Sequence, residues 1–215
     1  MKSIVLLSGG IDSATALYKA KELYDGVIAL TFDYEKWQKN ELRAARLIAR
    51  DASVKHIIVE LPFYKTLPSS PSSNDADIIG EEKGISLAYV PARNLVFFGV
   101  AAAYAEVLGA DIVVTGHNNN DIDRFPDVQR RFVETMNQAF ALGLKDGKNL
   151  KISLPFAKMT KYDVLNEAVR LNVPLEHTWS CYNDSSSACG KCYGCLSRKD
   201  AFEKLGIKDP LEVIA

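Results

Sequence analysis

The sequence has no cysteine outside one short segment, no surplus of basic residues and no long apolar run. All four cysteines of the 215 residues lie between positions 181 and 195, and 26 Lys and Arg stand against 27 Asp and Glu, for a formal net charge of −1. A protein that binds nucleic acid through many phosphates normally carries a basic surplus, so stable nucleic-acid binding is not expected. No run approaches the length of a membrane span, and the first residues enter a strand directly. Both observations predict a cytoplasmic protein with no membrane partner.

The segment 8–13, Ser-Gly-Gly-Ile-Asp-Ser, lacks the marks of two familiar phosphate loops. No lysine follows the glycines before Lys19, which excludes a Walker loop, and the third glycine of a dinucleotide loop is missing. The segment nevertheless joins an apolar strand to a helix, and the free N–H groups at a helix start form an anion site. Asp12 beside a phosphate predicts a Mg²⁺ ion between the two.

A tight turn without a ligand is the alternative for a bare Gly-Gly pair, but the whole string favours a nucleotide site. Ser8 and Ser13 add hydroxyl donors to it. The string resembles the PP-loop of the ATP pyrophosphatases, enzymes that activate a substrate oxygen with AMP and release pyrophosphate.

Strand-like and helix-like segments alternate along the chain. This pattern predicts an α/β fold with a doubly wound, mostly parallel five-stranded sheet and helices on both faces. We expect two units, a nucleotide-binding α/β domain at 1–172 and a small helical, cysteine-containing segment packed on it at 173–215. The expected strands are 3–8, 26–32, 54–60, 111–115 and 151–155, and the expected helices are 12–23, 42–52, 94–108, 128–140 and 160–171.

Three segments between or within these elements lead to further expectations. Residues 62–84 are rich in proline and serine and show little periodicity, so they are predicted to be a loop, either a lid over the substrate or a surface loop. The polar residues 116–121 are predicted to be a loop at the end of the fourth strand. The helix at 94–108 is apolar nearly all round, which predicts complete burial.

Residues at the carboxyl ends of the strands are candidates for ligand contact, because open α/β sheets bind ligands there. Arg93 and Asn94 stand at the entrance of the apolar helix, where ligand contact competes with a capping and salt-bridge role. His117 follows the fourth strand and is placed near the substrate. His56 lies in a strand, where a core histidine is the usual outcome.

The cysteines predict a metal site. Their spacings of seven, two and two residues supply four thiolates to one tetrahedral ion, and four thiolates leave no open position for catalysis. Structural Zn²⁺ is therefore expected, with disulfides, a redox Cys-x-x-Cys motif and an iron–sulfur cluster as the alternatives. The predicted ligands are Cys181, Cys189, Cys192 and Cys195.

Five motifs together resemble one family over nearly the whole chain. The family is that of the 7-cyano-7-deazaguanine synthases, PP-loop ATPases with an adenine nucleotide alpha hydrolase-like fold. At 35–38 and 122–127 the chain departs from the pattern of many members. The motifs are SGGIDS at 8–13, TFDY at 31–34, VPARN at 90–94, FPD at 125–127 and SCY…CGKCYGC at 180–195.

The resemblance implies an ATP-dependent ligase of the queuosine and archaeosine precursor pathway. It would convert 7-carboxy-7-deazaguanine and ammonia into the nitrile through adenylated carboxylate and amide intermediates. ATP would be a substrate, with Mg²⁺ and one structural Zn²⁺ per chain. The chain has no room for a glutaminase domain, so free ammonia is the expected nitrogen source, and the family leans toward a homodimer.

The resemblance also implies roles for individual residues. The catalytic set would be Ser8, Asp12, Ser13 and Arg93. The substrate contacts would be Arg93, Asn94, Asp121, Phe125 and Asp127. The ATP loop would comprise Leu7, Ser8, Gly9, Gly10, Ile11, Asp12, Ser13, Ala14, Thr15, Ala16 and Leu17.

Two other functions remain open from the residues. One is a different PP-loop enzyme that adenylates another carboxylate or a tRNA base for thiolation, although thiolation normally uses a spare cysteine, and none lies outside the cluster. The other is a zinc-containing binding module without catalysis, which the phosphate loop disfavours.

Overall fold

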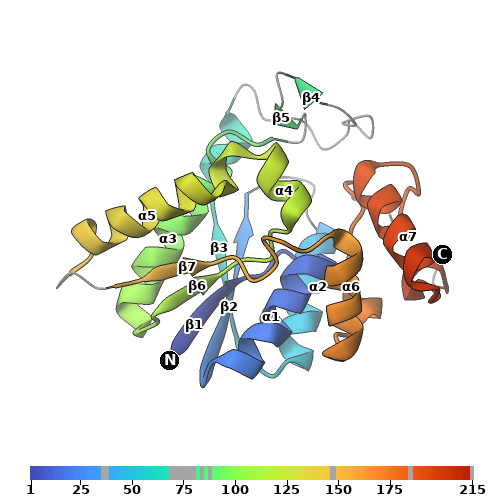
Figure 1. Cartoon of the computed structure of the whole chain (residues 1–215), viewed down its shortest axis with the longest axis horizontal. Helices are drawn as coiled ribbons and strands as arrows, with labels where there is room; N and C mark the ends of the chain where they lie inside the picture. The colour runs from blue at the N-terminus through green and yellow to red at the C-terminus, as the bar shows by residue number, and fades with distance from the viewer. Residues whose placement is uncertain are drawn as a thin grey trace.

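The computed structural model is built on one five-stranded parallel sheet (Figure 1). The structure describes residues 1–34, 39–67, 81–82, 85–86, 89–145, 149–183 and 186–213. The strand order is β3-β2-β1-β6-β7, so the chain winds outward from β1 in both directions. The strands are β1 Lys2–Leu6, β2 Gly26–Asp33, β3 Lys55–Glu60, β6 Ile112–Val114 and β7 Lys151–Ser153. The predicted doubly wound α/β fold is confirmed.

Helices cover both faces of the sheet. The α-helices are α1 Ile11–Leu23, α2 Lys39–Asp51, α3 Arg93–Leu108, α4 Asn119–Arg124, α5 Arg130–Gly143, α6 Lys161–Arg170 and α7 Tyr193–Leu205. In Figure 1, α3 and α5 lie on one side of the strands, and α1, α2 and α6 lie on the other. Each predicted helix is therefore present, with bounds within a few residues of those expected.

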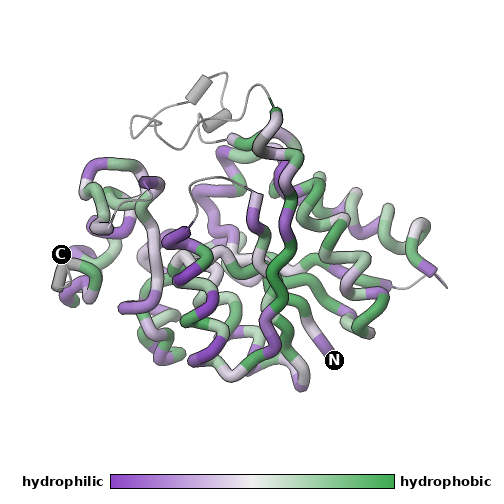
Figure 2. The backbone as a smooth tube through the Cα atoms, turned by 180° about the vertical axis from the view of Figure 1, so that it is seen from behind, coloured by the Kyte–Doolittle hydropathy of each residue, from purple (hydrophilic) through white to green (hydrophobic). Residues whose placement is uncertain are grey.

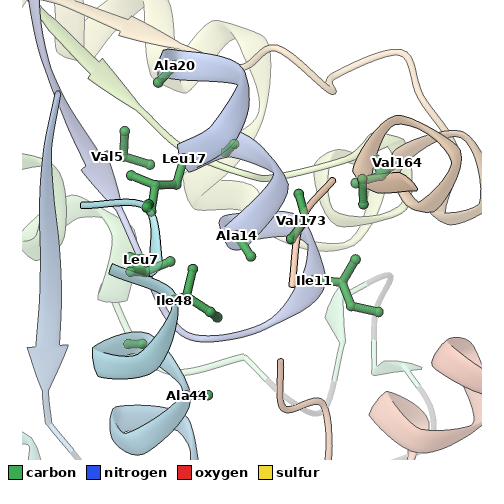
Figure 3. Packing of buried hydrophobic residues seen from close by; sticks show 14 of the residues in the cluster. Val5, Leu7, Ile11, Ala14, Leu17, Ala20, Ala44, Ile48, Val164 and Val173 are labelled. Carbon is green, nitrogen blue, oxygen red and sulfur yellow. The ribbon is translucent and has the colours of Figure 1, made fainter. Parts of the chain in front are cut away.

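The two faces of β1 explain why the run from Ile4 to Leu7, at its carboxyl end, is apolar without a break. Successive side chains of a strand point to opposite faces, so Val5 and Leu7 pack with α1, α2 and α6 (Figure 3), whereas Ile4 and Leu6 pack with α3 and α5. A parallel strand covered on both faces typically has a nearly continuous run of apolar residues. Figure 2 shows this concentration of hydrophobic residues in the central strands.

The expectation that helix α3 is completely buried is wrong. Phe98, Ala101 and Ala105 are fully buried against the sheet, but Leu95 is 46% exposed and Val107 is 83% exposed. The helix belongs to an outer layer, so only one side of it can face the strands. The apolar residues all round the helix predicted that its outer side would also be packed against protein. No described residue packs over that side at Leu95 and Val107.

The segment expected to be a polar loop after β6 is also different in the structure. Residues Asn119–Arg124 form the short helix α4. Its start is a capping box, in which Asn118 Oδ1 accepts from the Asn120 N–H at 2.9 Å and Asp121 Oδ2 accepts from the Asn118 N–H at 3.0 Å. Reciprocal capping stabilises a helix that has no apolar periodicity to reveal it.

Part of the predicted loop at 62–84 is ordered into small elements. Residues Pro62–Thr66 form a 3₁₀ helix, and β4, Glu81–Glu82, pairs antiparallel with β5, Ile85–Ser86. The positions 68–80 and 83–84 lie outside the described residues, as do the family departures at 35–38. The predicted lid therefore stays a prediction.

The C-terminal segment packs on the α/β core through α7. Ala201 and Phe202 of this helix belong to the same hydrophobic cluster as Leu165 of α6. The side chain of Arg198 forms a buried two-point ion pair with Asp209, with N···O distances of 2.6 and 2.8 Å. Arg198 also donates to the Thr178 hydroxyl at 2.7 Å, so one buried guanidinium joins three parts of the segment.

Candidate active site

The turn between β1 and α1 is held in shape by its own serines. Ser13 Oγ donates to Gly10 O at 3.0 Å, accepts from the Ser8 N–H at 3.1 Å and lies 3.0 Å from Ser8 Oγ. Gly9 has a φ of +92°, and a Cβ at this position would lie 2.5 Å from Glu41 O in α2. The glycine therefore permits both the turn and the close approach of α2.

Only part of the predicted ATP loop faces open space. Leu7, Ser8, Asp12 and Ser13 line a cavity of about 260 Å³ at the carboxyl ends of β1, β2 and β6, and Gly10 and Ile11 line a second one. Thr15 donates its hydroxyl to Ile11 O at 2.7 Å inside the helix. The side chains that pack in the core and line neither cavity are Ala14, Thr15, Ala16 and Leu17.

Asp12 lies at the junction of the two cavities and pairs with a lysine that the sequence did not single out. Lys161 Nζ donates to both carboxylate oxygens of Asp12 at 2.8 Å, and Asn118 Nδ2 donates to one of them at 3.3 Å. Burial raises the pKa of Asp12, and the Lys161 ammonium opposes that rise. The carboxylate is thus held between two donors at the start of α1.

Gly116 at the end of β6 permits the close approach of this strand to the loop. A Cβ at Gly116 would lie 2.6 Å from both the carbonyl carbon and the carbonyl oxygen of Asp12. Because backbone atoms cannot give way as a flexible side chain can, Asp12 must move if residue 116 carries a side chain. Gly116 thus sets the position of the Asp12 backbone.

Gly116→Ala is expected to lower the free energy of unfolding by about 1–3 kcal/mol through overpacking, and to lower turnover because Asp12 shifts. Gly99→Ala is the matched control. Gly99 lies in α3 with open space at its Cβ, so alanine there should be neutral or stabilise by up to about 1 kcal/mol. Denaturant unfolding and turnover of both variants check this, and equal behaviour would contradict the close contact.

Arg93 projects from the start of α3 toward the larger cavity. The residue before it, Ala92, has a φ of +53°, an uncommon conformation for alanine, and its N–H is held by the Tyr89 hydroxyl at 3.0 Å. Arg93 Nη1 donates to the Tyr34 hydroxyl at 3.2 Å, across from the end of β2. The guanidinium is thereby aimed at the space between β2 and α3.

The other predicted substrate residues are divided between the cavity and its support. Asn94, Asp121 and Phe125 line the 260 Å³ cavity together with Arg93. Asp127 is buried outside this lining, and its Oδ2 accepts from the Asn94 backbone N–H at 2.8 Å. Asp127 Oδ1 and Asn94 Nδ2 are buried without a hydrogen-bond partner among the described residues. The structure thus brings four of the five together and places Asp127 behind them.

His117 also lines the larger cavity, as expected from its position after β6. Its Nδ1 lies 2.7 Å from the Thr115 hydroxyl. Burial, with a smaller effect of the nearby Arg93 cation, lowers the pKa of His117 to about 4. The imidazole is therefore neutral at physiological pH. Burial likewise raises the pKa of Asp121 against the opposing hydrogen bond from Asn118.

The second cavity, of about 190 Å³, lies on the other side of Asp12. Ser8, Asp12 and Ser13 line it from the nucleotide loop, and Lys161 lines it from the start of α6. Its outer wall comes from the C-terminal segment, with Trp179, Ser180, Tyr182, Tyr193, Gly194 and Ser197. The two cavities therefore share the loop but differ in their remaining walls.

The four cysteines converge on one point. Their Sγ atoms all lie within 4.8 Å of one another, and Cys189 Sγ and Cys195 Sγ are 3.9 Å apart. Backbone N–H groups point at the sulfurs, with Cys189 N and Asn183 N at 3.3 and 3.4 Å from Cys181 Sγ. Donors aimed at sulfur stabilise thiolates, so these residues fit a tetrahedral metal ion.

The cysteine segment touches the nucleotide loop directly. The Trp179 N–H donates to Gly9 O at 2.9 Å, and Trp179 Nε1 donates to Cys181 O at 2.8 Å. Trp179 is thus bonded at once to the loop and to the first cysteine. The sequence did not predict this link between Trp179 and the loop. It also did not predict the contacts of Lys161 and Arg198, because neither residue lies in a motif that distinguishes it from an ordinary surface residue.

The fold and the loop together define the class of protein. Solved structures with the same fold include an NMN synthetase from Francisella tularensis, with a TM-score of 0.54, 18% identity and coverage of 96% of this chain and 78% of that one. The U34-tRNA thiolase NcsA from Methanococcus maripaludis with its [4Fe-4S] cluster also has a TM-score of 0.54 and 18% identity, over 95% of this chain and 66% of that one. The chain has the fold of the PP-loop ATPases.

The family follows from closer relatives. The model of the family "Queuosine biosynthesis protein QueC" matches residues 2–206. The 7-cyano-7-deazaguanine synthase of Nitratiruptor sp. is 39% identical over 98% of both chains, and that of Thermosynechococcus vestitus is 40% identical over 98% of this chain and 94% of its own. The chain belongs to the QueC family. In the described part of the chain, no helix is long and apolar enough to span a membrane.

Proposed function

We propose that the chain is an ATP-dependent ligase that converts 7-carboxy-7-deazaguanine and ammonia to 7-cyano-7-deazaguanine. The observation that carries this proposal is the shared position of Asp12, Ser8 and Ser13 beside a cavity that Arg93 and Phe125 also line. A phosphate site and a site for a small aromatic acid thus adjoin. The 7-cyano-7-deazaguanine synthases of Nitratiruptor sp. and Thermosynechococcus vestitus match this chain along nearly its entire length.

The reaction requires two activations of oxygen. In the first, a carboxylate oxygen attacks the α-phosphorus of ATP and pyrophosphate leaves, after which ammonia displaces AMP to form the amide. In the second, the amide oxygen attacks the α-phosphorus of another ATP and pyrophosphate leaves again, after which loss of AMP and of both N–H protons gives the nitrile. The protein's task in both is to align oxygen with phosphorus and to stabilise charge on the phosphates, so no nucleophilic side chain is needed.

The residues around the larger cavity suit these tasks. The Arg93 guanidinium offers paired donors to the substrate carboxylate. Phe125 offers an aromatic face for the heterocycle, and Asp121 offers acceptors for its amino and ring N–H groups. Asp127 acts from behind by holding the Asn94 backbone, since it is buried outside the cavity lining.

Mg²⁺ at the loop and Zn²⁺ at the cysteines complete the proposal. Asp12 would hold Mg²⁺, which would offset charge on the phosphates of ATP. The cysteine geometry supports one ion over an iron–sulfur cluster. The thiolates of a [4Fe–4S] cluster each bind a different iron and must stand further apart than thiolates that share one ion, whereas these sulfurs lie within 4.8 Å of one another.

We also propose that the chain forms a homodimer. The apolar side chains of Val107 in α3 and Leu142 in α5 are 83% and 89% exposed, which supports cover by a second copy. The mass of the purified chain in solution checks this.

The experiment that tests the function supplies the purified chain with ATP, Mg²⁺, ammonia and 7-carboxy-7-deazaguanine. The expected products are the nitrile, AMP and pyrophosphate. The matched reaction starts from the amide, which should give the nitrile with ATP but without ammonia. Release of pyrophosphate with some other acid, and none with this one, would contradict the proposed acceptor while leaving the adenylation chemistry intact.

A further inference from the structure

Protons must leave nitrogen in both steps of the proposed reaction. When ammonia bonds to the carbonyl carbon of the adenylated acid, its nitrogen becomes positively charged and must lose one proton to give the amide. Formation of the nitrile removes two further protons from the same nitrogen. A base beside the reacting carbon therefore serves both steps.

His117 is an imidazole placed near this carbon. It lines the larger cavity together with Arg93 and Asp12. Besides burial, which has the largest effect, the charges of Arg93, Asp127 and Asp12 act on its pKa. The ring therefore lies between the guanidinium proposed for the acid and the carboxylate proposed for the phosphate end of ATP. The carbon that ammonia attacks joins these two parts of the adenylated acid.

One ring nitrogen of His117 is held, and the other has no partner. Nδ1 lies 2.7 Å from the Thr115 hydroxyl, and Thr115 is itself buried just after β6. Nε2 makes no hydrogen bond to any residue that the structure describes. When Nδ1–H donates to the hydroxyl, the lone pair of the neutral imidazole is on Nε2. The ring then has a free acceptor in the cavity.

Two acidic side chains that also line the larger cavity are engaged elsewhere. Both oxygens of Asp12 accept from Lys161 Nζ at 2.8 Å. Asp121 Oδ2 accepts from the Asn118 N–H at the start of α4. By contrast, burial keeps His117 neutral and able to accept a proton, and the negative phosphates of bound ATP favour the protonated ring and so strengthen the base.

We propose that His117 Nε2 is the base that removes protons from the reacting nitrogen, which makes His117 a catalytic residue of both steps. In the first step the N–C bond forms, one proton passes from nitrogen to Nε2, and the bond from carbon to the AMP oxygen breaks with its electron pair leaving on AMP. In the second step Nε2 takes the two N–H protons in turn and passes each to water, while the same C–O bond breaks and the N–C bond becomes triple. The inference rests on the proposed ATP-dependent function.

His117→Gln separates this role from binding of the acid and of ATP. Adenylation is measured alone, as exchange of labelled pyrophosphate into ATP with 7-carboxy-7-deazaguanine and Mg²⁺ but without ammonia. Amide formation is measured after ammonia is added, and it should be slowed about 100- to 10,000-fold, the usual contribution of a positioned base, whereas exchange should be slowed far less. Imidazole added to His117→Gly should restore part of the rate of amide formation.

His177→Gln is the control, because His177 lies in the 3₁₀ helix Leu175–His177 of the C-terminal segment and is not among the described residues that line either cavity. Both of its rates should equal those of the parent chain. Equal losses of exchange and of amide formation in His117→Gln, or no loss of amide formation, would overturn the role of His117 as the base.

Nitrogen NMR of the labelled chain tests the tautomer independently of the acid. The ring of His117 should carry its proton on Nδ1 at neutral pH, and Thr115→Val should weaken that preference because it removes the hydroxyl. A ring with its proton on Nε2, or a doubly protonated ring, would overturn the proposal whichever acid is the substrate. A parent chain with the expected tautomer but without pyrophosphate exchange would contradict the proposed acceptor alone.

Discussion

Asp12→Asn is expected to lower turnover about 100- to 1000-fold, on the scale of losing one charge-stabilising group in an active site. Asparagine keeps the shape of the side chain but removes the negative charge that would hold Mg²⁺ and that pairs with Lys161 at 2.8 Å. The rate of AMP formation at several Mg²⁺ concentrations measures the effect. The variant should also require more Mg²⁺ for half-maximal rate.

Asp25→Asn is the control for this substitution. Asp25 is an exposed carboxylate that pairs with the N-terminal ammonium before β2, at the opposite end of the sheet from the loop. Its turnover should equal that of the parent chain. If Asp12→Asn keeps its turnover and its Mg²⁺ requirement, Asp12 does not have the proposed role.

Cys192→Ser is expected to remove the metal and to unfold the C-terminal segment at lower temperature. Cys192 is fully buried, and its backbone N–H donates to Cys189 Sγ at 3.4 Å, so the sulfurs depend on one another. Binding of structural zinc contributes about 10–16 kcal/mol in small peptides, and loss of about 4 kcal/mol here lowers the melting temperature by about 10 °C. Metal analysis and a thermal melt measure both effects.

Nucleotide binding should weaken in the same variant, because Trp179 is bonded to both Cys181 and Gly9. Lys191→Ser is the matched control, since it introduces serine at the exposed neighbouring position and should keep the metal. A Cys192→Ser chain that is metal-free, folded to the same temperature and active would show that the site is not structural.

The sequence by itself determined the features that depend on neighbouring residues. Apolar patterns, together with the capping residues at 160 and 163, predicted every strand of the main sheet and all described α-helices except α4 and α7. The abrupt stop of an apolar strand at Ser8-Gly9-Gly10 predicted the turn between β1 and α1. The spacing of the cysteines predicted their convergence, because two Cys-x-x-Cys steps bring the sulfurs together locally.

Local sequence patterns gave wrong predictions in two places: the burial of α3, which depends on how the layers pack, and the segment after β6, where side-chain capping forms a helix. The apolar circumference of α3 predicted burial on all sides, but a helix on the outside of a sheet has one face against the strands, and Val107 is exposed. The polar residues after β6 predicted a loop, yet Asn118 and Asp121 cap each other and form α4.

Only the tertiary structure decided which distant residues complete the site. Lys161 lies 149 positions from Asp12 and follows an ordinary helix cap, so its sequence context resembles that of any surface lysine. Trp179 reaches Gly9, and Gly116 lies against the Asp12 backbone, because the parallel order of β1 and β6 and the packing of the C-terminal segment bring them there. Such contacts depend on how whole elements pack, which residue spacing along the chain does not encode.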